Sequence, residues 1–316
     1  MDNKMIVSSS PHIGSSVKTK DIMRDVIIAL VPALIVSVVY FGINALIVVL
    51  ATVAACVISE YVCRKVMKRS NTVGDLSAVV TGLLLAFNLP VSTYKNIWLP
   101  VLGGIIAIVV VKQMFGGLGQ NFVNPALAAR IILMTSFPTL MTAWTAPGTS
   151  GVDAVSTATP LALIAEGKLG ELPNYMDMFL GNRAGSLGET CVAALLLGGI
   201  YLVVKKVISP IIPLTYIAVV FVFSAILGQD PVMQILSGGL FLGAIFMATD
   251  YTTSPLTNKG KFIYAIGCGL LTTLIRCFGS LPEGVSFSII IMNILVPHIE
   301  KLTTPKAFGV GKEAAK

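Results

Sequence analysis

Charged residues are scarce in this chain of 316 residues. Asp, Glu, Lys and Arg together make up 12% of it, while apolar residues make up 55%. A soluble domain usually carries about a quarter charged residues. So small a charged share excludes an ordinary soluble enzyme and indicates a chain that lies mostly in lipid.

Side chains that ligate metals are equally sparse. The two histidines, His12 and His298, lie far from any cysteine or carboxylate pair at metal-ligand spacing. The five cysteines form no C-x-x-C pair and lie within or beside apolar runs. This pattern disfavours a zinc site or an iron–sulfur cluster held by this chain alone. It leaves open buried thiols that act as small apolar groups, or a cysteine shared with another chain.

Nucleotide motifs and interior carboxylates are also missing from the sequence. There is no P-loop and no dinucleotide-binding fingerprint. Glu60 and Asp250 lie near the ends of apolar runs, and Asp25 precedes the first run. Because proton relays commonly use buried carboxylates or histidines, we expect no complete proton relay among the side chains of this chain.

Apolar runs dominate what is present. Most of them are long enough to cross a bilayer as helices, the form that satisfies backbone hydrogen bonds in lipid. The run at 77–89 is short and predicts a half-helix that stops inside the protein. The sequence therefore predicts an all-α polytopic membrane protein with about ten transmembrane helices. The ten runs cover residues 26–42, 43–63, 77–89, 97–113, 122–143, 189–204, 211–228, 232–249, 262–278 and 285–299.

The distribution of Lys and Arg predicts how these helices are oriented. With the N-terminus in the cytoplasm, 17 of the 22 basic residues fall on the cytoplasmic side and three fall outside. Cytoplasmic loops of membrane proteins carry such an excess. The net charge of +7 is therefore a sign of topology and not of nucleic-acid binding. Both termini are expected in the cytoplasm, and the loop 144–188 is expected outside.

Five runs precede that loop and five follow it, which is the layout of an inverted repeat. Phe115, Gly116 and Leu118 recur as Phe278, Gly279 and Leu281, with an offset close to half the chain. The sequence thus predicts two inverted five-helix repeats. The expected parts are a cytoplasmic N-terminal segment (1–21), a first repeat (22–143), an extracytoplasmic loop (144–188), a second repeat (189–299) and a cytoplasmic tail (300–316).

The extracytoplasmic loop contains a cluster of acidic and hydroxyl side chains, "DAVSTATP". A helix N-cap before Pro160 explains one hydroxyl. Four such side chains are more than a cap needs, and because helix N-termini favour anions, a site for a phosphate-bearing group near Thr159 is the second interpretation. The four residues are Asp153, Ser156, Thr157 and Thr159.

This stretch resembles the covalent flavinylation motif, Asp-x-x-Ser/Thr-Gly-Ala-Thr/Ser. In proteins with that motif, a flavin transferase links FMN through its phosphate to the final hydroxyl. The resemblance makes Asp153 the acid, Ser156 the first hydroxyl and Thr159 the acceptor. Thr157 stands where the pattern usually has glycine, so it is a rival acceptor.

Four further stretches resemble the RnfD family of the Rnf electron-transport complexes and its close relative, the NqrB family of the sodium-translocating NADH:quinone reductases. They are "SSPHIGSSVKTKDIMRDVIIALVPA", "TGLLLAFNLP", "FGGLGQNFVNPALAARI" and "GAIFMATDYTTSPLTNKG". The resemblance implies a component of a redox-driven pump in the inner membrane, which couples ferredoxin–NAD electron transfer to Na⁺ or H⁺ transport. It implies Rnf subunits A, B, C, E and G as partners, and a flavin transferase for maturation.

The resemblance also implies a second, non-covalent flavin of the riboflavin type near Asn121 and Asn124. An amide pair three residues apart can bind the polar edge of a flavin, but Asn124 before Pro125 is also a helix cap. Arg130 either stabilises a reduced flavin, or it reaches the cytoplasmic face or pairs with a carboxylate. Asp250 either belongs to a turn before Pro255 or faces the Asn124 site.

Two functions of other kinds remain open from the sequence. One is a solute channel or secondary transporter of the inverted-repeat type, with "DAVSTATP" as an external gate. The other is a structural membrane scaffold. Flavin that stays with the denatured chain distinguishes the electron-transfer component from both.

Overall fold

The computed structural model describes residues 18–148, 157–279 and 283–305. These residues form helices joined by loops, with no β-strand among them. The helices are α1 (Thr19–Phe41), α2 (Ile43–Val66), α3 (Ser77–Phe87), α4 (Trp98–Ile105), α5 (Pro125–Ser136), α6 (Pro138–Met141), α7 (Pro160–Ala165), α8 (Tyr175–Leu180), α9 (Val192–Val204), α10 (Ile211–Ile226), α11 (Pro231–Leu236), α12 (Leu240–Leu242), α13 (Asn258–Phe278) and α14 (Val285–Thr303). Two π-helical segments, η3 (Ile106–Gln113) and η5 (Gly243–Met247), continue α4 and α12, and short 3₁₀ turns lie at η1 (Val73–Asp75), η2 (Val91–Asn96) and η4 (Leu169–Glu171).

Four helices of the described chain are long and apolar enough to cross a membrane: α1, α2, α13 and α14. Shorter apolar helices accompany them: α3, α4 with η3, α5, α9 and α10. Large apolar side chains on the outside of the bundle are exposed, among them Val39 at 74% and Ile226 at 70%. Helices with so much outward apolar surface fit a multi-pass membrane protein, as the composition predicts.

The apolar run at 232–249 does not form the single continuous helix that its length predicts. It breaks at Ser237–Gly239, between α11 and α12. Gly238 has φ +62°, and a Cβ there would lie 2.8 Å from Leu161 Cδ1 and 3.1 Å from Arg276 Nη2. The break therefore needs a glycine for both its backbone angle and the space around it.

The run at 122–143 is also divided, between α5 and α6. Phe137 separates the two helices with φ −132° and ψ 57°, outside the helical region. Pro138 follows it, and a proline disfavours helical geometry in the residue before it. Asn124 and Pro125 begin α5, so this apolar run yields only 12 residues of regular α5.

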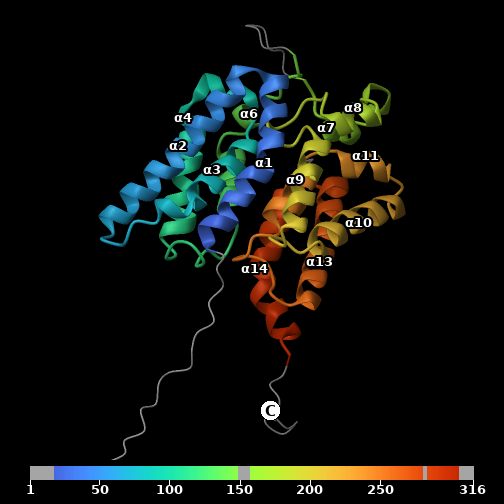
Figure 1. Ribbon diagram of the computed structural model, residues 1–316. Helices are drawn as coiled ribbons and strands as arrows, with labels where there is room; N and C mark the ends of the chain where they lie inside the picture. The colour runs from blue at the N-terminus through green and yellow to red at the C-terminus, as the bar shows by residue number, and fades with distance from the viewer. Residues whose placement is uncertain (1–17, 149–156, 280–282, 306–316) are drawn as a thin grey trace, which may run out of the picture.

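The two halves of the chain lie side by side (Figure 1). In the first half α2 packs on α3 and α4, and in the second half α10 packs on α11 and α13. The contacts of α1 with α9 and of α5 with α14 join the halves. One apolar core contains residues of both halves, including Leu30, Phe87 and Leu127 from the first and Tyr216 and Phe246 from the second.

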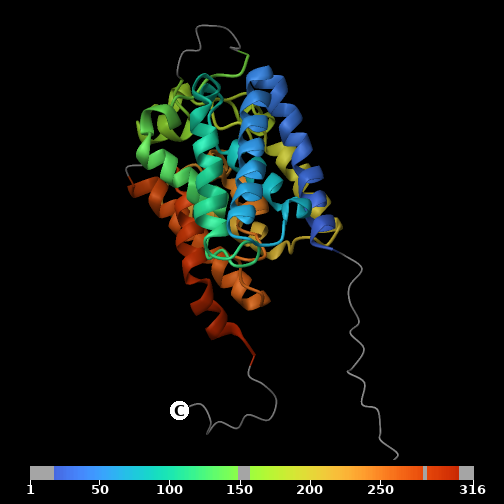
Figure 2. The same ribbon diagram turned by 90° about the vertical axis from the view of Figure 1, so that its left-hand side faces the viewer.

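The ends of the helices divide the bundle into two faces. Figures 1 and 2 show that α1 begins and α14 ends toward the same, lower end. Helices α7 and α8 lie toward the opposite, upper end (Figure 1). There the Tyr175 hydroxyl of α8 donates a 2.5 Å hydrogen bond to Asp230, and this bond raises the pKa of the tyrosine.

Candidate functional site

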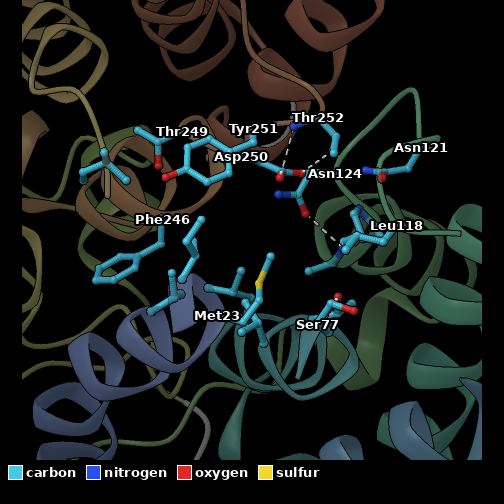
Figure 3. Close-up of a pocket in the computed structure, with 18 of the residues that line it drawn as sticks. Met23, Ser77, Leu118, Asn121, Asn124, Phe246, Thr249, Asp250, Tyr251 and Thr252 are labelled. Atoms are coloured by element: carbon cyan, nitrogen blue, oxygen red, sulfur yellow. Dashed lines mark hydrogen bonds between the residues drawn. The ribbon is translucent and has the colours of Figure 1, made fainter. Parts of the chain in front are cut away.

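A cavity lined by Ile22 and Met23 at the start of α1 opens near the lower end of the bundle (Figures 1 and 3), and its space together with its open mouth is about 780 Å³. We call it the Asn124 cavity. Its apolar wall comes from α1, α3 and η5 and includes Met23, Leu84 and Phe246. Its polar side chains come mainly from the loops before α5 and after η5, and the rest come from α3 and η3. The polar lining residues are Ser77, Thr81, Lys112, Asn121, Asn124, Thr249, Asp250, Tyr251 and Thr252.

The Asn124 side chain forms three hydrogen bonds to the backbone beside this cavity. Its Oδ1 accepts hydrogen bonds from the backbone N–H groups of Ala126 at 3.0 Å and Leu127 at 3.3 Å. Its Nδ2 donates to the Met247 carbonyl at 3.3 Å. The interpretation of Asn124 as a helix cap is therefore confirmed. Because an amide NH₂ carries two hydrogens, one donor remains for a ligand.

Asp250 lies on the same cavity as the two asparagines, although it is 126 residues beyond Asn124 in the chain. Its carboxylate accepts hydrogen bonds from the hydroxyls of Thr252 at 3.1 Å and Thr253 at 3.4 Å. Asp250 therefore belongs to the turn before Pro255 and also lies on the same cavity as Asn124. Asn121 donates from its Nδ2 to the Val123 carbonyl at 3.1 Å.

A buried ion pair forms one side of the cavity. Lys112 Nζ lies 2.9 Å from Glu60 Oε2 and 2.6 Å from Ser77 Oγ. The side chains of Lys112 and Glu60 are 3% and 0% exposed. Thr72 donates a further hydrogen bond of 2.6 Å to Glu60. The sequence indicated a Glu60 near the end of a helix, but it did not indicate this partner.

Arg130 lies in the interior, away from the residues that line the Asn124 cavity. Its Nη1 is 2.7 Å from Glu189 Oε1, its Nη2 pairs with Glu283, and Nη1 also donates to Asn88 Oδ1. The interpretation that Arg130 pairs with a carboxylate is confirmed. The Asn88 side chain in turn donates a hydrogen bond to the sulfur of Met247. The backbone carbonyl of Met247 accepts a hydrogen bond from Asn124. Polar contacts therefore connect the Asn124 cavity with Arg130.

The expectation that the interior lacks carboxylates is wrong. Glu189 is 3% exposed and Glu60 is fully buried. The burial of Glu60 and Glu189 was not predicted, because each residue lies at the end of an apolar run, where a carboxylate usually reaches water. The available signal was the excess of cations within the runs: Lys112, Arg130 and Arg276 each need a partner in lipid.

A second, smaller pocket of about 270 Å³ lies toward the upper end of the bundle. We call it the Thr159 pocket. Thr159 caps α7, since its Oγ1 accepts a 3.3 Å hydrogen bond from the Ala162 N–H. The buried guanidinium of Arg183 also lines the pocket and donates to the Glu189 carbonyl at 2.8 Å. Its other lining residues are Pro160, Leu161, Ala184, Gly185, Glu189, Thr190, Gly238 and Glu283.

The rest of the predicted motif is described in part. The Thr157 N–H donates to the Trp144 carbonyl at 2.9 Å, and the Thr157 hydroxyl is buried with no hydrogen-bond partner. Asp153 and Ser156 lie outside the described residues. The rival acceptor Thr157 thus faces inward, whereas Thr159 lines a pocket.

The arrangement is that of a multi-pass helical membrane protein with a partly polar cavity near one face and a smaller pocket near the opposite face. The model of the NQR2, RnfD, RnfE family matches residues 6–309, and the chain belongs to this family.

Three relatives in the family extend over almost the whole chain. The D subunit of the Na⁺-translocating ferredoxin:NAD⁺ oxidoreductase complex of Acetobacterium woodii is 50% identical, over 98% of this chain and 96% of its own. The D subunit of the proton-translocating ferredoxin:NAD⁺ oxidoreductase complex of Clostridium ljungdahlii is 44% identical, over 97% of each chain. The D subunit of the ion-translocating oxidoreductase complex of Stutzerimonas stutzeri is 37% identical, over 91% of each chain.

Proposed function

We propose that this chain is the flavin-carrying membrane component of a ferredoxin:NAD⁺ oxidoreductase that pumps Na⁺ or H⁺. The observation that carries the proposal is the 50% identity, over 98% of the chain, with a relative whose complex is named for that activity. In the proposed assembly the chain works with Rnf subunits A, B, C, E and G, and a flavin transferase matures it. It contributes electron transfer and is not catalytic alone.

The residues around Thr159 fit a phosphoester of FMN on that hydroxyl. Its oxygen accepts a bond from Ala162 N–H, so it keeps its own proton and a lone pair for attack on phosphorus. Arg183, 5% exposed in the same pocket, supplies positive charge for the phosphate. FMN supplies one- and two-electron transfer when bound. The pocket is smaller than the roughly 300–1,000 Å³ typical of ligand sites, so it suits the phosphate but not the ring.

The Asn124 cavity fits a second, non-covalent flavin. The apolar wall from α1, α3 and η5 suits a planar ring system. The free amide hydrogen of Asn124, the amide of Asn121 and the carboxylate of Asp250 suit its polar edge. Flavins in the two sites would lie toward opposite faces, as vectorial electron transfer requires.

We also propose ten spans in two inverted five-helix repeats, residues 22–143 and 189–299. The third span of the first half is short, namely α3, and its counterpart is broken into α11, α12 and η5. In transporters with inverted repeats, short or broken segments at corresponding positions indicate the binding site. Here α3 and η5 both line the Asn124 cavity, which supports the repeat and the site together.

The proposed orientation places the lower end of the bundle in the cytoplasm and the upper end outside. Met176, which is 68% exposed on α8, should react as Met176→Cys with a membrane-impermeant thiol reagent in intact cells. Leu256, which is 78% exposed before α13, should react as Leu256→Cys only after lysis. Labelling is measured above the background of the native cysteines. The reverse pattern would contradict the orientation.

Asn124→Ser should lower the content of releasable flavin in the purified complex while the covalent flavin stays. Serine keeps the helix cap but removes the amide donor. Loss of one buried hydrogen bond costs on the order of 1–3 kcal/mol, so binding should weaken roughly tenfold. Asp230→Ser is a matched control, because Asp230 caps α11 before Pro231 and does not line the cavity. An equal content of releasable flavin in both variants would show that the second flavin does not bind in this cavity.

One measurement separates the proposed function from a transporter or a scaffold. Protein produced together with the flavin transferase is denatured, precipitated with acid and examined for fluorescence. Yellow-green flavin emission that moves with the polypeptide in a denaturing gel supports an electron-transfer component. A dark band from fully matured protein would contradict it.

A further inference from the structure

A third cavity, of about 640 Å³, lies at the upper end between the segment after α3 and the segment after α6. We call it the Trp144 groove, after the indole that lines it. Tyr94, Lys95 and Thr145 line it too. Ser92 holds the two segments together by donating a 2.7 Å hydrogen bond to the Ala143 carbonyl. The groove thus presents two aromatic side chains and one cation on a fixed frame.

Two properties of the groove favour a planar ligand with polar edges. Aromatic side chains bind flat π-systems by stacking, and nearby cations strengthen such sites. The Lys95 ammonium lies 5.9 Å from the centre of the Tyr94 ring. The Thr145 hydroxyl is 7% exposed and has no hydrogen-bond partner, so a buried polar group is available to a ligand.

The attachment segment is connected directly to this groove. The Thr157 N–H bonds to the carbonyl of Trp144, so Thr159 follows two residues after a point fixed on the groove wall. Two residues span at most about 7 Å. The ribityl phosphate of FMN adds eight bonds between the threonine oxygen and the ring, about 10 Å at backbone-like advance per bond. The tether is long enough for the ring to reach the groove.

We propose that the Trp144 groove binds the isoalloxazine ring of the flavin whose phosphate is attached at Thr159. The inference rests on the proposed function, because without covalent FMN the groove has no tethered ring. The Thr159 pocket then holds the phosphate, and the groove holds the ring between Trp144 and Tyr94. The Thr145 hydroxyl bonds to the polar edge of the ring.

Indole and phenol side chains that contact a flavin quench its fluorescence by electron transfer, and phenylalanine does so far less. The test compares the native with the denatured fluorescence of the full chain in detergent, per covalent flavin. In the unmodified protein the native emission should be several-fold lower. Trp144→Phe should raise the native emission toward the denatured value. Trp98→Phe is the matched control, since Trp98 is the other tryptophan of the chain and packs on Phe137, outside the groove.

The outcomes distinguish the two levels of the proposal. A denatured band without flavin in the unmodified protein would overturn the proposed function and this inference with it. Covalent flavin whose native emission is as bright in the unmodified protein as in Trp144→Phe would overturn only the inference. If Trp144→Phe does not fold, Tyr94→Phe tests the second aromatic side chain of the groove, and unchanged emission there also overturns the inference.

Discussion

Thr159→Val should abolish covalent flavin on this chain and, with it, ferredoxin:NAD⁺ electron transfer and ion uptake by the complex. Valine has the shape of threonine but no hydroxyl to attack phosphorus. The cap of α7 is lost as well, which costs only about 1 kcal/mol, so the protein should still fold. Peptide mass mapping should show that the fragment with Thr159 gains one FMN less one water in the unmodified protein and nothing in the variant.

Two companion variants make this result specific. Thr159→Ser restores a hydroxyl at the same position and should restore the covalent flavin. Thr157→Val removes the rival hydroxyl, which is buried and without a partner, and should leave the flavin in place. If covalent flavin remains in Thr159→Val and is absent from Thr157→Val, then FMN is attached to Thr157 and not to Thr159.

Arg130→Met should destabilise the protein by about 3–5 kcal/mol, because buried Glu189 and part-buried Glu283 lose the cation with which they form ion pairs. Arg130 lies on α5 in the first half of the chain, while Glu189 precedes α9 and Glu283 precedes α14 in the second. The variant therefore loosens the two halves from each other. Thermal unfolding in detergent measures the loss.

Neutralising the two carboxylates tests whether their charge causes this loss of stability. In the triple variant Arg130→Met, Glu189→Gln, Glu283→Gln, neither carboxylate is left charged without its ion-pair partner, so much of the stability should return. The control is Arg24→Met, since Arg24 is 3.7 Å from Asp21 in an exposed pair worth about 0–1 kcal/mol. A single variant at Arg130 that unfolds like Arg24→Met would show that the buried cluster contributes little.

Some residues of the polar sites could be predicted from the sequence, and others could not. Thr159 was predicted from a local motif, because the acceptor and its neighbours are close in the chain. Asn124 and Asp250 were singled out separately, and the tertiary structure places them on one cavity. The burial of Arg183 and Glu189 was not predicted, because a loop and a helix end usually lie in water, and only the tertiary structure shows both side chains buried.

The sequence by itself determined the class of this protein and the positions of most of its helices, because long apolar runs with few charges are stable only as helices in lipid. It also indicated the family through motifs that are contiguous in the chain. The tertiary structure alone decided where the run at 232–249 breaks, since Gly238 must leave room for Leu161 and Arg276. It alone decided that Arg130 joins the two halves through Glu189 and Glu283. Such pairings depend on which distant helices meet, and no local pattern of residues carries that information.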